Sequence, residues 1–182
     1  MNPRISRTLG AALASAALTT LAACSSDTGS SKPASHGDTT TEQVSRNAHA
    51  FMTAWMATSP SDGTTMCELQ TKAARPNSGT DGGTLAGCIK QRREDNDTDP
   101  ADNTGGTLTI TISKIQDVPA SDEHPAGKGA LATMAQPGKN QFRYVLRLVK
   151  EGGKWLVEQT NEVGERLTQT EDPVAPVLAQ HS

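Results

Sequence analysis

Acid–base chemistry in this chain would have to come from a few side chains, of which the strongest candidates are His49, His124 and the pair Tyr144 and Asp117. His49 lies off the apolar stripe of the first predicted helix and His124 lies in a polar segment, so both are expected at the surface. For Tyr144, core packing with its hydroxyl at the rim is the simpler interpretation. Because no Ser/His/Asp order, phosphate-binding glycine loop or paired-carboxylate motif is present, we expect no catalytic residues and no enzymatic activity.

The acidic run from Asp95 to Asp99 is the strongest candidate for a metal site. Its alternating oxygen side chains resemble the start of an EF-hand calcium loop. Such loops need glycine at the sixth position and a bidentate glutamate at the twelfth, where this chain has Pro100 and Gly106. The run is therefore more typical of a solvated loop, and we expect neither a metal ion nor a cofactor.

The N-terminal segment is built like an export signal. Arg4 and Arg7 make its start positive, and residues 9–22 form an uncharged apolar stretch that is too short to span a bilayer of roughly 30 Å. The stretch continues into Leu-Ala-Ala ahead of Cys24, which resembles the lipobox of bacterial lipoproteins, where the cysteine is lipidated. The resemblance implies a signal peptide over residues 1–23 and an acyl anchor on Cys24. An ordinary cleaved signal with an incidental cysteine is the alternative.

Two cysteines remain once Cys24 is assigned to the anchor. Outside the cytoplasm Cys67 and Cys88 can oxidise and stay oxidised, so a disulfide between them is expected. A metal site is disfavoured, because the chain has no Cys-x-x-Cys, no histidine near either cysteine and no third soft ligand. A catalytic thiol would need a free cysteine beside a base, and is also disfavoured.

Net charge limits the class of partner. The chain has 17 basic and 20 acidic residues, and loss of Arg4 and Arg7 with the signal would leave 15 against 20, a formal charge of −5. Because a polyanion needs a basic face, we expect no nucleic-acid partner. The expected partners are the membrane, through the lipid on Cys24, and an envelope protein or a second copy of the chain, with a small-molecule ligand as an alternative. The expected location is the outer face of the cytoplasmic membrane.

Composition and helix signals divide the chain into segments. Residues 24–38 are rich in Ser, Gly, Thr and Pro and lack large apolar side chains, so they are expected to form a flexible tether. Thr39 and Glu42 form a capping box ahead of a long amphipathic helix, which two shorter helices follow. The tail 166–182 contains two prolines and is expected to be loose. A single domain is therefore predicted over residues 39–165.

The second half of that domain has the alternating pattern of β-strands. Apolar and polar side chains alternate over residues 108–113 and again over 142–149, with a weaker strand between them. The parity breaks at Ile115, which predicts a bulge, and the pair Gly152-Gly153 predicts a hairpin turn into a fourth strand. The predicted fold class is α+β, with N-terminal helices packed on a curved antiparallel four-stranded sheet.

The closing hairpin, residues 144–157 with its Gly-Gly-Lys-Trp turn, looks like the final hairpin of the nuclear transport factor 2-like (SnoaL-like) superfamily. The order of one long helix, two short helices and a meander is also similar to that superfamily, including its small exported lipoproteins in high-GC Gram-positive bacteria. The resemblance covers roughly residues 40–165 and implies a cone with a pocket between helix and sheet. The candidate pocket residues are Met52, Trp55 and Tyr144. A cystatin-like helix-on-sheet fold is the alternative.

A candidate interaction face lies on the strand that contains Arg143, Val145 and Arg147, whose side chains would point away from the helix. Arginine is enriched at binding hot spots, although an ordinary half-wet sheet surface is the alternative. The predicted function is therefore a lipid-anchored cell-envelope protein with a non-catalytic interaction module. The alternatives are a small-molecule carrier that uses the cone pocket and, less favoured, an enzyme of the same fold.

Overall fold

The protein is described by a computed structural model over residues 39–57, 60–76, 83–98, 108–138 and 141–180, all within the unit His36–Ser182. The predicted signal peptide, Cys24 and the tether fall outside these ranges. The acidic run, predicted to be a solvated loop, is helical from Asp95 to Thr98, and Asp99 lies outside the described ranges. Of the helices in the described ranges, none has the length and apolar character needed to cross a membrane.

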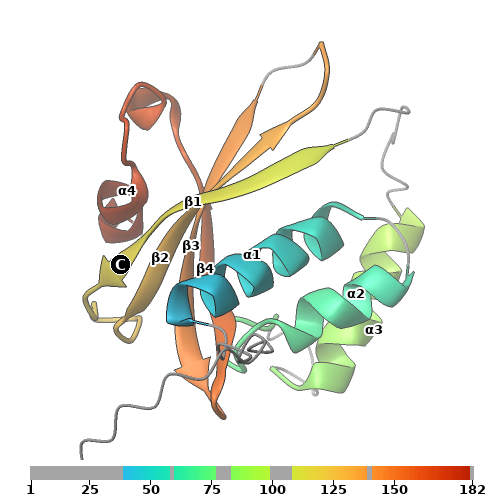
Figure 1. Ribbon diagram of the computed structural model, residues 1–182. Helices are drawn as coiled ribbons and strands as arrows, with labels where there is room; N and C mark the ends of the chain where they lie inside the picture. The colour runs from blue at the N-terminus through green and yellow to red at the C-terminus, as the bar shows by residue number, and fades with distance from the viewer. Residues whose placement is uncertain (1–38, 58–59, 77–82, 99–107, 139–140, 181–182) are drawn as a thin grey trace, which may run out of the picture. The chain divides into compact units, whose positions relative to one another are not determined.

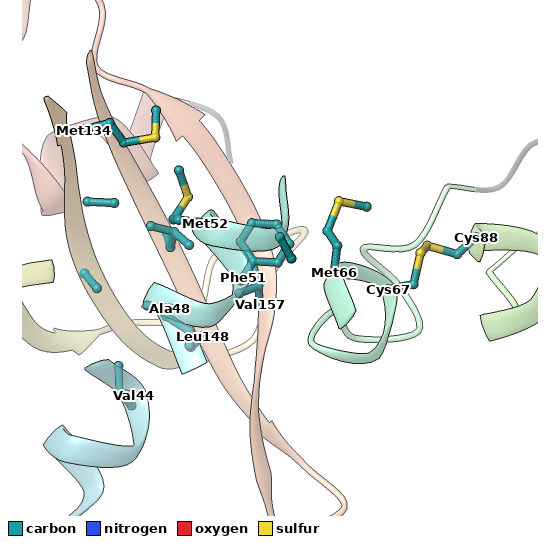
Figure 2. Close-up of a cluster of buried hydrophobic side chains, with 14 residues drawn as sticks. Val44, Ala48, Phe51, Met52, Met66, Cys67, Cys88, Met134, Leu148 and Val157 are labelled. Atoms are coloured by element: carbon teal, nitrogen blue, oxygen red, sulfur yellow. A yellow bond between two sulfur atoms is a disulfide. The ribbon is translucent and has the colours of Figure 1, made fainter. Parts of the chain in front are cut away.

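The first helix, α1 (Thr40–Met56), begins where the sequence predicts. The Glu42 amide donates to Thr39 Oγ1 at 3.2 Å, and the Thr39 amide donates to Glu42 Oε2 at 2.7 Å. This reciprocal pair is the predicted capping box, and it satisfies two backbone groups at the start of the helix. One face of α1 carries apolar side chains that are buried in the main core: Val44, Ala48, Phe51 and Met52 (Figure 2).

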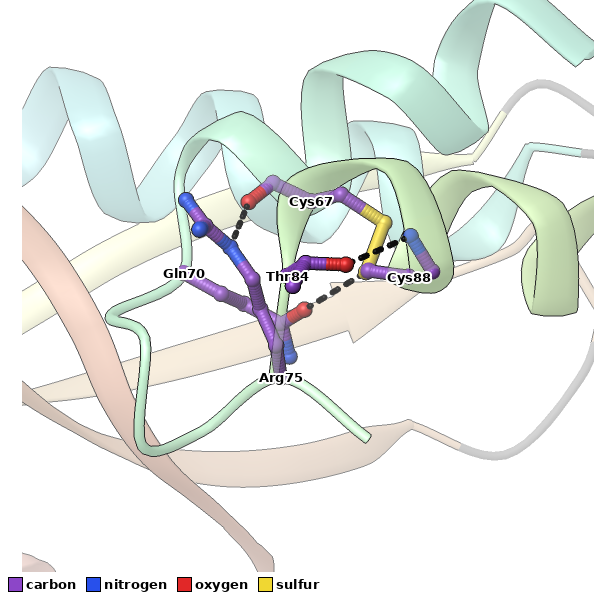
Figure 3. The surroundings of a disulfide bond; sticks show 6 residues. Cys67, Gln70, Arg75, Thr84 and Cys88 are labelled. Atoms are coloured by element: carbon purple, nitrogen blue, oxygen red, sulfur yellow. Dashed lines mark hydrogen bonds between the residues drawn. A yellow bond between two sulfur atoms is a disulfide. The ribbon is translucent and has the colours of Figure 1, made fainter. Parts of the chain in front are cut away.

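Two shorter helices, α2 (Pro60–Glu68) and α3 (Leu85–Thr98), are joined by a disulfide. Cys67 and Cys88 form this bond with their Cα atoms 6.0 Å apart, which confirms the predicted pairing (Figure 3). Arg75 Nε donates to the Cys67 carbonyl at 3.0 Å and holds the segment after α2 against the bond. The disulfide therefore fixes together two helices that have few apolar side chains of their own.

Four antiparallel strands follow, and they lie in the sheet in the order β1-β2-β3-β4. Their bounds are β1 (Thr109–Val118), β2 (Gly127–Ala135), β3 (Phe142–Glu151) and β4 (Lys154–Glu162). The predicted bulge lies in β1, where the register shifts between Ser113 and Gln116. Gly152 and Gly153 have φ of 58° and 83°, as the predicted hairpin turn requires. Helices followed by a four-stranded antiparallel sheet confirm the α+β arrangement.

Helices cover both faces of the sheet (Figure 1). On one face, α1 packs against alternate residues of β2 and β3, among them Ala132 and Leu146. The opposite face carries Leu131 and Val145, which pack against a C-terminal helix, α4 (Val174–Gln180). The sheet is therefore the middle layer of three, with a separate apolar core on each side.

The C-terminal segment is not the loose tail that its prolines predict. α4 buries three apolar side chains that are all at or below 2% exposed: Val174, Val177 and Leu178. Gly129 of β2 permits this close packing, because a Cβ there would lie 2.4 Å from Val174 Cγ1. Pro173 precedes α4 and Pro176 lies in its first turn, where backbone amides have no partner within the helix and a proline is tolerated.

Candidate functional site

A cavity of about 330 Å³ lies between the three N-terminal helices and β4, and we name it the β4 cavity. Its apolar wall consists of side chains from α1, α2, α3 and β4: Phe51, Trp55, Met66, Cys88 and Val157. Its polar wall includes Gln70, Arg92, Asp95, Glu158 and Thr160. Polar and apolar residues contribute equally to the lining. A concave site that combines an apolar wall with polar groups is a candidate for small-molecule binding.

Trp55 provides the largest aromatic surface of the β4 cavity. Its ring meets Tyr144 edge-on, with centroids 5.0 Å apart and planes at 77°, and its centroid is 6.1 Å from that of Phe51. Burial raises the pKa of Tyr144 above its ordinary value, and the negative charge of Glu162 adds to this shift. Met52 is fully buried in the core. Of the three predicted pocket residues, only Trp55 lines the cavity. Tyr144 packs against the Trp55 ring, and the side chain of Met52 is buried in the core between α1 and the sheet.

β4 contains a bulge at Glu158, a residue at the edge of the β4 cavity. Val157 pairs with Leu148 of β3 in the regular antiparallel ladder. The next paired residue is Gln159, which lies opposite Arg147, so Glu158 is the extra residue on this strand. A bulge of this kind redirects a side chain. Glu158 is one of the residues that line the cavity, and its carboxylate contacts Thr71 and His124.

Two side chains hold the Glu158 carboxylate, and Glu158 as a whole is only 9% exposed. Thr71 Oγ1 donates to Oε2, and His124 Nδ1 lies 3.5 Å from Oε1. The Thr71 amide donates to the Val157 carbonyl at 3.0 Å, so the segment after α2 is bound to the edge of β4. The side chain of His124 is 18% exposed, which corrects the surface position predicted for it: the loop between β1 and β2 folds back onto β4.

Arg147 forms hydrogen bonds with the loop between β1 and β2. Its Nη1 donates to the Pro119 carbonyl at 2.6 Å and to the Pro125 carbonyl at 3.0 Å, near the two ends of the loop. Its Nε donates to Gln159 Oε1 at 3.2 Å. Burial lowers the pKa of Arg147 from its usual value, and the negative charge of Glu158 opposes this shift. The guanidinium is thus hydrogen-bonded both to the loop between β1 and β2 and to β4.

The interaction face predicted on β3 is not exposed. Val145 and Arg147 are 0% and 2% exposed, because α4 and the loop between β1 and β2 cover them. Arg143 donates to the Thr168 carbonyl at 2.7 Å and to the Thr170 carbonyl at 3.1 Å, in the segment that leads to α4. The C-terminal segment of the chain therefore occupies the surface that the sequence left open to a partner.

Arg92 crosses from α3 to the end of α1. Its Nη2 donates to the Trp55 carbonyl at 2.6 Å. Its aliphatic part passes Gly63 of α2, where a Cβ would lie 2.9 Å from Arg92 Cγ. Its Nε is buried and has no hydrogen-bond partner among the described residues. Arg92 therefore ties two cavity walls together through its guanidinium.

The arrangement of Thr71, Glu158 and His124 places the carboxylate between the hydroxyl and the imidazole. Hydrolytic triads have the opposite order, with the imidazole between the hydroxyl and the carboxylate, so that the base can take the hydroxyl proton. The geometry here holds a carboxylate in place between the segment after α2 and the loop between β1 and β2. Within the described ranges, no cluster of three or more His, Cys, Asp or Glu side chains is placed to hold a metal ion.

Thr71, Arg92 and Glu158 are site residues that the sequence did not indicate. The one signal in the sequence is the polar pair Glu158-Gln159, which interrupts the alternation of the last strand after Val157. Such an interruption is compatible with a bulge, but it does not say toward which side the extra residue turns.

Comparison with protein-family models, with curated proteins and with solved structures finds no match to this chain. The chemistry of the β4 cavity is therefore the basis for assigning a function.

Proposed function

We propose that the domain binds a small molecule in the β4 cavity. The observation that carries this proposal is the cavity itself, with its volume of about 330 Å³ and its aromatic wall around Trp55. Small-molecule sites span roughly 300–1,000 Å³, so a compact ligand suits this one. A hydrogen bond within the protein already holds Arg92, a polar residue of the wall. A site that is organised in advance loses less entropy when its ligand binds.

Binding without catalysis is the interpretation that the contacts favour. Thr71 and His124 both hold Glu158, so neither is arranged as a nucleophile beside its base. A partner-binding module on β3 has less support than the cavity, because the chain itself covers Val145 and Arg147. The cavity between helices and sheet supports the cone-like fold of the nuclear transport factor 2-like superfamily, with the cystatin-like fold as the alternative.

We also propose that the protein is exported and anchored through a lipid on Cys24, at the outer face of the cytoplasmic membrane. The lipobox-like sequence before Cys24 supports the anchor. The disulfide between Cys67 and Cys88 supports export, because disulfides persist in oxidising compartments and are rare in the cytoplasm. The ligand would then be met in the cell envelope.

Filling the cavity tests the binding proposal. Ala74 lines the β4 cavity, and Ala74→Phe would place a ring inside it. Ala73 is exposed and lies outside the lining, so Ala73→Phe is the matched control. The exported protein, purified without reducing agent, is screened against compact compounds by the fluorescence of Trp55 in a Trp155→Phe background.

We expect at least one compound to change the fluorescence of Trp55, with binding that Ala74→Phe abolishes and Ala73→Phe retains. The physical reason is steric, since a phenyl ring takes up a large part of a cavity of about 330 Å³. Binding that survives equally in both variants, or the absence of any binding compound, would contradict the proposed function.

A further inference from the structure

We propose that a second copy of the chain docks along the outer side of β1, over residues 109–113, which we name the β1 edge. β1 is an outer strand of the sheet (Figure 1), so one of its two sides has no neighbouring strand. Among the described residues, no backbone hydrogen bond joins that side to another segment. The amides and carbonyls of an unpaired strand edge can pair with a strand of another chain. The lining of the β4 cavity includes no residue of β1, so this inference is independent of the proposed ligand binding.

The chain itself protects the other edges of the sheet. On β4, the Val157 carbonyl accepts a hydrogen bond from the Thr71 amide at 3.0 Å, so the segment after α2 covers that side. On β1, the strand beyond the β1 edge is bent by the bulge, where Lys114 has a φ of 52° and its Nζ donates to Glu171 Oε1 at 3.2 Å. A bulge and a lysine both hinder pairing at a strand edge, as proline does. The β1 edge has none of the three.

The sequence of the β1 edge, Thr-Ile-Thr-Ile-Ser, is complementary to itself in an antiparallel pair. If Thr111 lies opposite Thr111 of the second copy, Ile110 lies opposite Ile112 and Thr109 lies opposite Ser113. Isoleucine then meets isoleucine on the face that α1 covers, and hydroxyl side chains meet on the other face. Apolar pairs and pairs of Thr with Thr or Ser both stabilise antiparallel strands. A shift of one residue would place isoleucine opposite threonine and lose this match.

The apolar side chains of the β1 edge are incompletely covered. Ile110 and Ile112 pack against the main core but are only half-buried, whereas their neighbours in the central strands are fully buried. A second copy would remove the remaining apolar surface from water. A groove of about 490 Å³ separates Ile112 from α1, and the charged side chains that border it are Glu42 and Arg46. Their formal charges cancel, so this groove presents no net charge that would repel a second copy.

The dimer formed in this way should be weak and reversible. Stable interfaces have roughly 20–30 residues on each side, while the β1 edge has five and the groove beside it adds a few side chains of α1. We therefore expect the exported protein to associate at micromolar or higher concentration, with a sedimentation coefficient that rises with concentration.

Cysteine crosslinking tests the proposed register. Residues directly opposite each other in an antiparallel pair have Cα atoms about 4.5–5.5 Å apart, a span that a disulfide can bridge. We expect the exported Thr111→Cys variant to form a covalent dimer under mild oxidation, as seen on a non-reducing gel. Thr109→Cys is the matched control, because Thr109 is also an exposed threonine of this strand. In the proposed register it lies four residues, or about 13 Å, from its own copy and should not crosslink.

Two further measurements complete the test. A mixture of Thr109→Cys with Ser113→Cys should crosslink, although neither variant does so alone, and the unsubstituted protein measures any crosslinking through its own cysteines. Thr111→Lys places like charges opposite each other and should weaken the dimer roughly fivefold in sedimentation, while Thr109→Lys should have a smaller effect. No covalent dimer of Thr111→Cys, equal crosslinking of Thr111→Cys and Thr109→Cys, or an unsubstituted protein that stays monomeric at submillimolar concentration would overturn the inference.

Discussion

Removal of the disulfide between Cys67 and Cys88 should strongly destabilise the domain. The two cysteines are 21 residues apart, and the loop-closure entropy of a chain segment of that length corresponds to about 3 kcal/mol at 25 °C. The double variant Cys67→Ala/Cys88→Ala also removes sulfur atoms from positions that are 0% and 1% exposed. The lost packing adds to the entropic effect, so we expect a decrease of about 3–5 kcal/mol in the free energy of unfolding.

Urea denaturation of the exported protein and the double variant, followed by tryptophan fluorescence, measures this decrease. Because the crosslink restricts the unfolded chain, the variant should also have a steeper dependence of unfolding free energy on urea. Reductant should destabilise the unsubstituted protein by a similar amount and leave the double variant unchanged, which is the internal control. A loss below about 1 kcal/mol would refute the reasoning, since it would mean that the crosslink does not restrict the unfolded chain as its loop length requires.

The structure also predicts the direction of a stability change at Gly129 and of the pKa shift of Tyr144. Gly129→Ala places a Cβ 2.4 Å from Val174 Cγ1 and should lower the unfolding free energy by about 1–3 kcal/mol. Gly164→Ala has open space around the added Cβ and should change it by less than about 0.5 kcal/mol, so equal effects in urea denaturation would contradict the packing of α4 on β2. Tyr144 is the single tyrosine of the chain, and its pKa, raised by burial and by Glu162, should appear as an ultraviolet titration midpoint above the ordinary value of about 10. Because the pKa is higher in the folded state, Tyr144 contributes stability at pH values below its unfolded pKa, and this contribution is lost as pH rises through the folded pKa. A titration midpoint of the folded protein at or below that of the urea-unfolded chain would contradict the burial of Tyr144.

Local signals in the sequence were enough for the three N-terminal helices and the four strands. The Thr39–Glu42 capping box, the alternation in β1 and β3 and the turn at Gly152-Gly153 each depend on neighbours within a few residues. The cysteine pair was predictable because only two cysteines remained once Cys24 was assigned to the anchor. Trp55 and Tyr144, which were both named as candidate pocket residues, do lie in contact, with ring centroids 5.0 Å apart.

The site itself depends on contacts between distant segments, and these could not be predicted. Glu158 meets Thr71 and His124 at a bulge that forms only when β4 pairs with β3. Arg147 looked exposed because the alternation of β3 says which residues share a face but not what covers that face. α4 covers that face. The prolines of this segment argued against a helix, but the helix begins at Val174, whose amide donates to Asp172 Oδ1 at 3.1 Å.

Native mass spectrometry tests the central claim, ligand binding in the β4 cavity, most directly. The exported protein and its Ala74→Phe variant are purified without reducing agent and incubated with the small-molecule fraction of the exporting cells. We expect the unsubstituted protein to carry one compact organic molecule that is released on denaturation, and Ala74→Phe to carry none, because its added ring fills a cavity of about 330 Å³. Identical spectra of protein without ligand, or the same bound mass in both proteins, would contradict the claim.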